Sequence, residues 1–284
     1  MPKRLLLAND LPGIGKVALA ASMPILAACQ VETAILPTVL LSSHTGGFTN
    51  IALADMSQLL VDYLAQWQSL KLHVDGLLIG YSRRASLFER LEKYATDEKI
   101  PIILDPILGD NGKLYSGFDQ NDVLAMRQLA GQAKVLMPNL TEAAFLTDSP
   151  YLGNEYGRSE IEQLLVKLAD FGAEQIVLTG ISFDEEQIGL AHYDVKADKV
   201  SYHMTQRFPQ HFFGTGDMVA SLVAALYVEK IDFDRGLPQI LQFVEKSLQE
   251  TVDLARDVKY GVYFEPHLAE LSQVFEEFRR ENEK

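Results

Sequence analysis

Short apolar runs alternate along the chain with longer segments that have helical spacing. The runs are apolar at successive positions, which is typical of parallel strands covered by helices on both faces of a sheet. The alternation predicts βαβ units. The predicted strands are residues 4–8, 31–40, 74–80, 100–105, 133–139 and 174–180, and the predicted helices are residues 14–29, 50–70, 84–97, 120–131, 159–171, 215–229, 237–256 and 267–282.

The domain organisation follows from the lack of a linker-like, repetitive or low-complexity segment in the sequence. Residues 187–204 hold two strand-like runs around a polar turn and predict a hairpin appended to the sheet. We therefore expect residues 1–284 to form a single α/β domain, although the length alone allows two.

The charge of the chain limits which classes of molecule it can bind. The formal net charge is −14, and the Lys and Arg residues are scattered, so the surface repels nucleic acid and anionic lipid. We expect no nucleic-acid and no membrane partner. Cys29 is the one cysteine, which fits a reducing compartment and favours a cytoplasmic location. The apolar stretch 17–29 is too short to span a membrane and predicts a buried helix.

The stretch NDLPGIGKVALA, residues 9–20, has the look of a nucleotide-binding loop. It does not match the phosphate loop G-x-x-x-x-G-K-[ST], because Asp10 stands at the first Gly position and Val17 follows Lys16. Gly13 and Gly15 fit the start of G-x-G-x-x-G, but Ala18 stands at its last position. A weak dinucleotide site and a tight strand-to-helix turn both remain open.

Polar and small residues follow the predicted strands, and the carboxyl ends of parallel strands meet at one edge of a sheet, where ligands bind. We expect a site there, built from Asn9 and Asp10, residues 43–47, Gly80 and Tyr81, Asp105 and Asp110, Asn139 and Glu142, Thr179 and Gly180, and residues 214–217.

Two of these groups suggest phosphate chemistry. Gly214 and Gly216 bracket the start of an apolar helix, whose free N–H groups form an anion site. Asp217 in its first turn is either functional or only a favourable charge or cap. Carboxylates gathered at Asp105, Asp110 and Glu142 would repel each other without a cation such as Mg²⁺. The alternatives are a turn at Asp105 and a helix cap formed by Asn139 or Thr141.

Taken together, the segments LSSHTGGF, IGY, DPILGDNGKLY, PNLTEA, LTG, GTGD and GVYFEP, in this order and spacing, resemble the vitamin B6 (pyridoxal/pyridoxine) kinases of the ribokinase-like superfamily. The resemblance runs from Leu5 to about Leu271. It implies a three-layer α/β/α sandwich with a mostly parallel central sheet, a homodimer, and ATP-dependent phosphorylation of the 5′-hydroxymethyl group of pyridoxal, pyridoxine or pyridoxamine.

The resemblance also implies roles for single residues. Asp217 would be the general base, and Gly214, Thr215 and Gly216 would form the anion hole. The metal side would hold Asp105, Asp110 and Glu142, and the ATP side Asn139, Glu142, Thr179, Gly180 and Tyr115. The substrate side would hold Asn9, Asp10, His44, Thr45, Tyr81 and Asp217. The implied cofactors are ATP and Mg²⁺, with a monovalent cation (K⁺ or Na⁺) left open, and the Gly-containing residues 44–48 and 109–118 are candidate lids.

The end of the first strand departs from the animal-type B6 kinases, which carry Ser there and a longer loop. Asn9 and Asp10 with a short Gly loop instead resemble the hydroxymethylpyrimidine kinases of thiamine synthesis. That substrate is the alternative. An alternative of another class is a non-catalytic nucleotide- or ligand-binding α/β protein.

Overall fold

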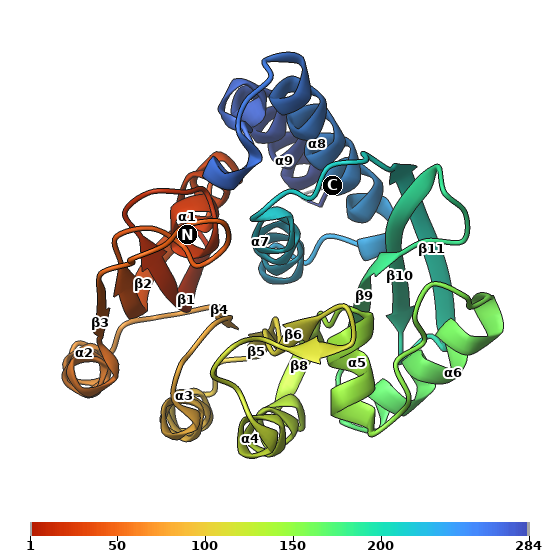
Figure 1. The fold of residues 1–284 in the computed structure, drawn as a ribbon. Helices are drawn as coiled ribbons and strands as arrows, with labels where there is room; N and C mark the ends of the chain where they lie inside the picture. The colour runs from red at the N-terminus through yellow and green to blue at the C-terminus, as the bar shows by residue number, and fades with distance from the viewer. Residues whose placement is uncertain (1, 283–284) are drawn as a thin grey trace. The chain divides into compact units, whose positions relative to one another are not determined.

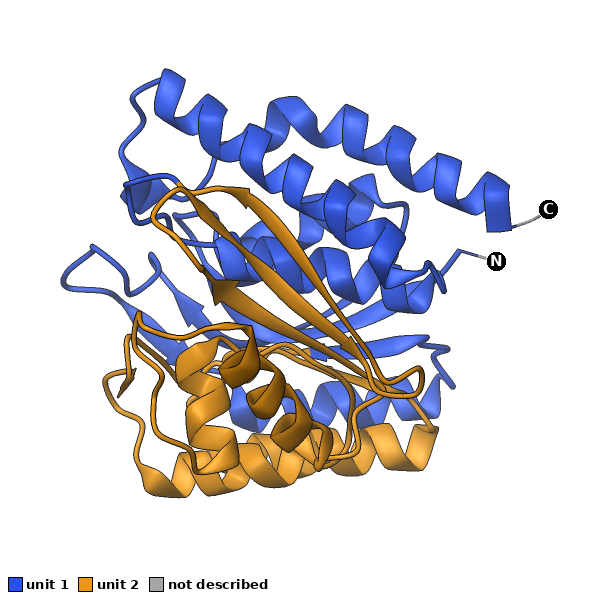
Figure 2. Ribbon diagram, turned by 90° about the vertical axis from the view of Figure 1, so that its right-hand side faces the viewer, with its two compact units in different colours: residues 1–78, 208–284 blue, residues 79–207 orange. Residues whose placement is uncertain are grey.

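The computed structural model describes residues 2–282 of the chain. By their contacts these residues fall into two compact units, which Figure 2 colours separately. Unit 1 combines the N-terminal part, up to residue 78, with the C-terminal part from residue 208. Unit 2 is residues 79–207.

The strands of unit 1 lie in the order β4-β1-β2-β3, with bounds β1 (Arg4–Pro12), β2 (Glu32–Leu41), β3 (Leu53–Asp55) and β4 (Gly76–Ile79). β1 and β2 are parallel, and β3 pairs with β2 in the antiparallel direction. Residues 5–8 are at most 1% exposed, because helices cover this part of the sheet and every residue of the apolar run is buried.

Helices pack on both strands of the β1–β2 pair. α1 (Ala18–Ala28) and α7 (Thr215–Val228) contact β1, and α2 (Ser57–Ser69) contacts β2. α7 also packs against α8 (Phe233–Asp253), while α9 (Leu268–Asn282) packs against α1 (Figure 1). The apolar stretch 17–29 is therefore a buried helix, as predicted, and no helix among residues 2–282 has the length and apolarity to cross a membrane.

Unit 2 has the strand order β5-β8-β9-β10-β11, with bounds β5 (Ile102–Leu104), β8 (Ala133–Leu136), β9 (Gln175–Ile181), β10 (Gln187–Asp194) and β11 (Lys199–Gln206). β5, β8 and β9 are parallel, and β10 and β11 form the predicted antiparallel hairpin. Its helices lie along one side of these strands in Figure 2; they are α3 (Ala85–Glu98), α4 (Gln120–Ala130), α5 (Leu140–Thr147) and α6 (Arg158–Ala169).

Three local features differ from the sequence predictions. β1 continues through Pro12, since residues 11 and 12 pair with β2 and the Gly13 N–H donates to the Leu41 carbonyl at 2.8 Å. The first helix accordingly begins at Ala18 rather than at residue 14. Strand β3 occupies the start of the predicted helix 50–70, and a small hairpin, β6 (Gly109–Asp110) with β7 (Lys113–Leu114), was not predicted. Pairing between strands decides these segments, and local spacing does not reveal it.

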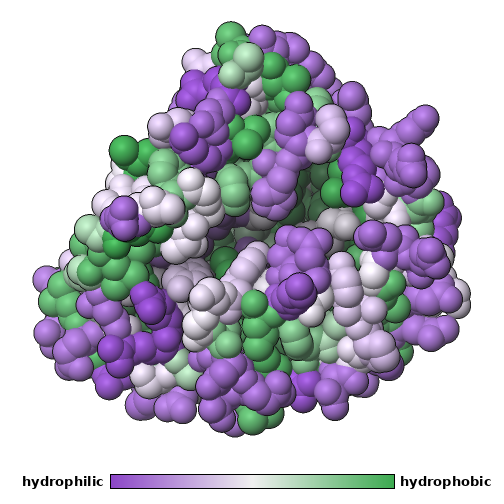
Figure 3. Space-filling view, viewed as in Figure 1, coloured by the Kyte–Doolittle hydropathy of each residue, from purple (hydrophilic) through white to green (hydrophobic). Residues whose placement is uncertain are grey.

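Apolar side chains gather on the surface of unit 1 over β2 and β3, at the left of Figure 3. Leu40 on β2, Leu53 on β3 and Leu59 on the neighbouring α2 are 36–44% exposed. β3 is the outermost strand of its sheet, with all three residues exposed. An exposed strand edge with apolar side chains is a surface that favours association.

Candidate functional site

Asp217 lies in the first turn of α7 in unit 1, with its side chain partly buried. Asn9 Nδ2 donates a hydrogen bond to Asp217 Oδ1 at 3.3 Å, and the main-chain N–H of Ala18 donates to the same carboxylate. Burial raises the pKa of Asp217, while both hydrogen bonds and the nearby His44 oppose that rise. A held carboxylate with a raised pKa is suited to accept a proton.

Gly214 caps α7 in the left-handed conformation, with φ +89°. A Cβ atom at this position would lie 2.2 Å from the main-chain oxygen of Lys16, so the turn requires glycine. Gly216 is exposed and open, with nothing within 4 Å of where its Cβ would be. The N–H groups of the first turn of α7, Thr215 among them, have no acceptor within the helix and can bind an anion.

Asp10 is a second carboxyl group beside Asp217, and only 8% of the residue is exposed. Burial, followed by the charge of Asp217, raises the pKa of Asp10 from 3.8 to about 7. Two neighbouring carboxyl groups in different surroundings divide the roles of proton donor and proton acceptor between them.

The raised pKa of Asp10 makes the stability of the protein depend on pH. Between about pH 4 and pH 7 the folded state holds a proton that the unfolded state has lost, so the free energy of unfolding falls as pH rises through this window. We expect Asp10→Asn to remove the contribution of Asp10 to this slope, so that the slope becomes shallower, and to raise the free energy of unfolding at pH 8 by about 1–3 kcal/mol. Urea unfolding from pH 4 to pH 8 measures it. Asp62→Asn, on an exposed face of α2, should keep the wild-type slope, and an unchanged slope in Asp10→Asn would contradict the assignment.

His44 is 4% exposed, and the main chain engages both of its ring nitrogens. Nε2 lies 2.6 Å from the Lys259 carbonyl, and Nδ1 accepts from the Gly46 N–H at 3.1 Å, so Nε2 carries the hydrogen that faces the Lys259 carbonyl. Phe48 and Phe213 pack against the ring. His44 thus shapes the loop beside Asp217, while Thr45 is exposed on that loop.

The opening loop packs onto this group. Gly15 has φ +101°, and a Cβ there would lie 2.2 Å from His44 Cδ2. The Lys16 N–H donates to the Tyr260 carbonyl at 3.1 Å, and its amine pairs with Glu265 and lies over the Tyr263 ring. This arrangement favours the tight-turn interpretation of residues 13–17, because the Lys16 charge is already paired.

Asn139 and Glu142 form a reciprocal cap at the start of α5 in unit 2. Asn139 Oδ1 accepts from the N–H groups of Thr141 and Glu142, and its Nδ2 donates to the Gly109 carbonyl at 2.9 Å. Glu142 accepts from the N–H groups of Asn139 and Leu108, at 2.8 and 3.2 Å. The cap expected as an alternative is present, and it fastens the loop after β5 to α5.

The three carboxyl groups predicted on the metal side lie in this loop region. Within residues 2–282, Asp105, Asp110 and Glu142 do not form a group whose ligand atoms all lie within 4.8 Å of one another. Burial raises the pKa of Glu142 to about 8, and the charge of Asp110 adds to the rise. Oxygen donors of this kind suit Mg²⁺, which takes one or two carboxylates and completes its shell with water and phosphate.

The remaining predicted residues of unit 2 lie in strands or shortly after them. Thr179, within β9, bridges to Asn139, and Gly180 follows with φ +71°. Tyr115 is 44% exposed after β7, and Tyr81 stacks edge-on against Phe118 at 5.7 Å between ring centroids. Thr179 therefore lies beside the Asn139–Glu142 cap.

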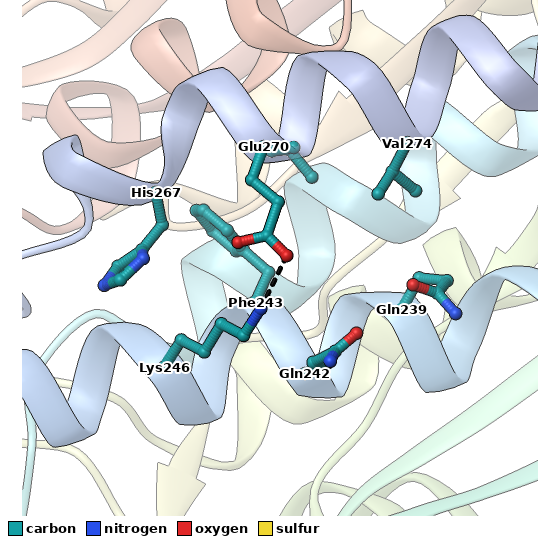
Figure 4. Close-up of a pocket in the computed structure, with 8 residues that line it drawn as sticks. Gln239, Gln242, Phe243, Lys246, His267, Glu270 and Val274 are labelled. Carbon is teal, nitrogen blue, oxygen red and sulfur yellow. Dashed lines mark hydrogen bonds and ion pairs between the residues drawn. The ribbon is translucent and has the colours of Figure 1, made fainter.

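A small pocket elsewhere in unit 1 contains none of the predicted site residues. It lies between α8 and the start of α9, where Lys246 and Glu270 form an ion pair across it at 2.5 Å (Figure 4). Its lining residues are Gln239, Gln242, Phe243, Lys246, His267, Glu270, Leu271 and Val274. The pair neutralises both charges, so the pocket offers no free charge to a ligand.

Sequence reasoning missed three contacts. It placed Asn9 on the substrate side and did not foresee that the Asn9 amide donates to the Asp217 carboxylate. It gave no role to Ala18, whose N–H reaches Asp217 from a residue with φ 48°. Thr141, one of the two residues considered as a cap, is not the cap; it accepts the Gly112 N–H at 2.9 Å and anchors the β6–β7 hairpin. No local pattern marks these contacts.

A family model described as phosphomethylpyrimidine kinase matches residues 20–261. Among curated proteins, a Schizosaccharomyces pombe protein provisionally named a pyridoxal kinase is 27% identical over 215 residues, which is 71% of this chain. The chain covers 61% of the length of that relative.

The solved structures that match nearly the whole chain include the following two. The Lactobacillus plantarum pyridoxal kinase is 36% identical, with a TM-score of 0.89, over 97% of this chain and 98% of the other. A Bacteroides thetaiotaomicron protein, provisionally named a phosphomethylpyrimidine kinase and crystallised with pyridoxal, is 28% identical, with a TM-score of 0.90, over 95% and 96%. These matches confirm the predicted ribokinase-like α/β fold class.

Proposed function

Because the chain belongs to the phosphomethylpyrimidine kinase family, we propose that it transfers the γ-phosphoryl group of ATP to the 5′-hydroxymethyl group of pyridoxal, pyridoxine or pyridoxamine. The observation that carries the proposal is the Asp217 carboxylate in the first turn of α7, held by Asn9 beside the free N–H groups that follow Gly214. The identity to a pyridoxal kinase over 97% of the chain supports the substrate class.

Unit 1 supplies the base and the anion site. As the substrate oxygen forms its bond to the γ-phosphorus, Asp217 accepts the hydroxyl proton, and the bond from phosphorus to the leaving ADP oxygen breaks. The N–H groups of Thr215 and Gly216 stabilise the negative charge on the transferring group. In this proposal Asp10, Thr45 and the loop shaped by His44 border the substrate ring.

Unit 2 supplies the nucleotide side of the proposal. Asn139, Thr179, Gly180 and Tyr115 would border ATP. Asp105, Asp110 and Glu142 would hold Mg²⁺, directly or through water, and that ion neutralises phosphate charge when bound. A monovalent cation, K⁺ or Na⁺, and a place for Tyr81 beside the substrate ring remain predictions from the resemblance.

The hydroxymethylpyrimidine of thiamine synthesis is the second candidate substrate. Two observations favour it: the description of the matching family and the carboxyl group of Asp10 in the C-terminal part of β1. Both substrates present a hydroxymethyl group on a nitrogen-containing ring, so the same base and anion site would serve either one.

A substrate panel tests the proposal. The protein is incubated with ATP and Mg²⁺ and, in turn, with each B6 vitamer and hydroxymethylpyrimidine, and ADP release and product mass are measured. We expect kcat/KM for the best vitamer to exceed that for the pyrimidine by about tenfold or more. The reverse order would favour the second candidate. ADP release with none of them would favour the non-catalytic binding protein.

Three broader points belong to the same proposal. Residues 1–284 act as a single kinase domain, and the location is cytoplasmic. The exposed apolar side chains of Leu53 on the edge strand β3 and of Leu40 on the neighbouring β2 support a homodimer, since an exposed strand edge of this kind favours a second copy.

A further inference from the structure

Asn9 lies at the point in unit 1 where two carboxyl groups come together. Its Nδ2 donates to Asp217 Oδ1 at 3.3 Å, and its Oδ1 accepts the main-chain N–H of Asp10 at 3.0 Å. The residue is 8% exposed, as is Asp10. The amide therefore links the segment that carries one carboxyl group to the side chain of the other.

The second hydrogen bond fixes which way the amide faces. Because Oδ1 is held by the Asp10 N–H, the Nδ2 hydrogens face Asp217. The reverse orientation would place a carbonyl oxygen against a carboxylate and would leave the Asp10 N–H without this acceptor. Asn9 thus offers a fixed donor to Asp217.

The backbone explains why two adjacent residues, Asn9 and Asp10, both lie near Asp217. Successive side chains of a regular strand point to opposite faces of the sheet. The pairing of β1 with β2 shifts register between Asn9 and Leu11, and such an irregularity re-aims side chains. Asn9 reaches Asp217 by a hydrogen bond, while the charge of Asp217 acts on Asp10 and raises the pKa of that carboxyl group.

We propose that Asn9 is a positioning residue, which holds the Asp217 carboxylate ionised and in place so that Asp217, and not Asp10, accepts the proton of the substrate hydroxyl. The inference rests on the proposed kinase function. It reassigns Asn9, which the resemblance placed among the groups that touch the substrate.

The groups around Asp217 set the sign of the expected effect. Burial disfavours the charged form of Asp217, while the N–H of Ala18 and the nearby His44 favour it, and the charge of Asp217 raises the pKa of Asp10 on β1. The Asn9 hydrogen bond is one of the interactions that lower the pKa of Asp217 against burial. Its removal should move the acid limb of the kcat–pH profile to higher pH.

The test compares Asn9→Ala with Asn9→Asp. Both remove the donor, and Asn9→Asp keeps an acceptor for the Asp10 N–H. We expect kcat at neutral pH to fall about 10- to 100-fold in both, with KM for ATP changed by less than about threefold. We also expect an acid limb at higher pH in both, with the larger shift in Asn9→Asp. Lower stability with an unmoved acid limb would show a merely structural role and overturn the proposal.

A matched control and a second measurement separate this proposal from the kinase proposal. Ser247→Ala removes a buried hydrogen bond within α8, from Ser247 Oγ to the Phe243 carbonyl, and should leave the acid limb unchanged. Carboxyl ¹³C NMR titration, with Asp217→Asn to assign the signal, follows Asp217 without turnover. A midpoint that rises in Asn9→Ala supports the coupling even if no vitamer is phosphorylated. An unchanged midpoint overturns it even in an active kinase.

Discussion

Asp217→Asn should reduce kcat for B6 phosphorylation by about 10³-fold while ATP still binds with an affinity within about threefold of wild type. The substitution keeps the size of the side chain and an oxygen that can accept from Asn9 and Ala18, so the fold is preserved. It removes the group that takes the hydroxyl proton. Steady-state kinetics and ATP titration calorimetry measure the two quantities.

Asp234→Asn is the matched control for this experiment. Asp234 is also an acidic residue in the first turn of a helix, α8, so the substitution makes the same chemical change outside the proposed site. We expect wild-type kcat in this variant. Equal kcat in Asp217→Asn and wild type would overturn the general-base role and favour a helix-terminal charge at Asp217.

Gly214→Ala should be the most destabilising of the substitutions considered, at about 3–5 kcal/mol. The residue has φ +89°, which costs a non-glycine residue free energy, and the new Cβ would lie 2.2 Å from the Lys16 oxygen. Rotation of a side chain cannot relieve contact with a main-chain atom, so the 13–17 turn or the start of α7 must move. We expect Tm to fall by about 10 °C, measured by thermal unfolding, together with a loss of kinase activity.

Gly216→Ala, two residues along, provides the stability control. Its φ lies outside the left-handed region, and its Cβ would have nothing within 4 Å. Its free energy of unfolding should equal or slightly exceed that of wild type, since alanine has the higher helix propensity. If both variants unfolded at the wild-type temperature, the packing of Gly214 against Lys16 would have no part in stability.

The strands and helices were largely predictable because each carries its signal locally. Apolar runs such as residues 5–8 marked buried strands, and helical spacing marked α3, α4 and α6 within one or two residues. The Asn139–Glu142 cap was also expected, since its partners are three residues apart. Where the Pro12–Gly13 turn signal suggested a loop, pairing with β2 extended the strand.

The candidate site also has a part that the sequence predicts and a part that only the tertiary structure reveals. The sequence determined which residue types stand at each strand end, since order and spacing along the chain define the motifs that resemble a kinase family. Only the tertiary structure decided that Asn9 faces Asp217, across 208 positions of sequence, and that the main chain engages both His44 nitrogens. A hydrogen bond between distant residues depends on how strands and helices pack, and no local pattern encodes that packing.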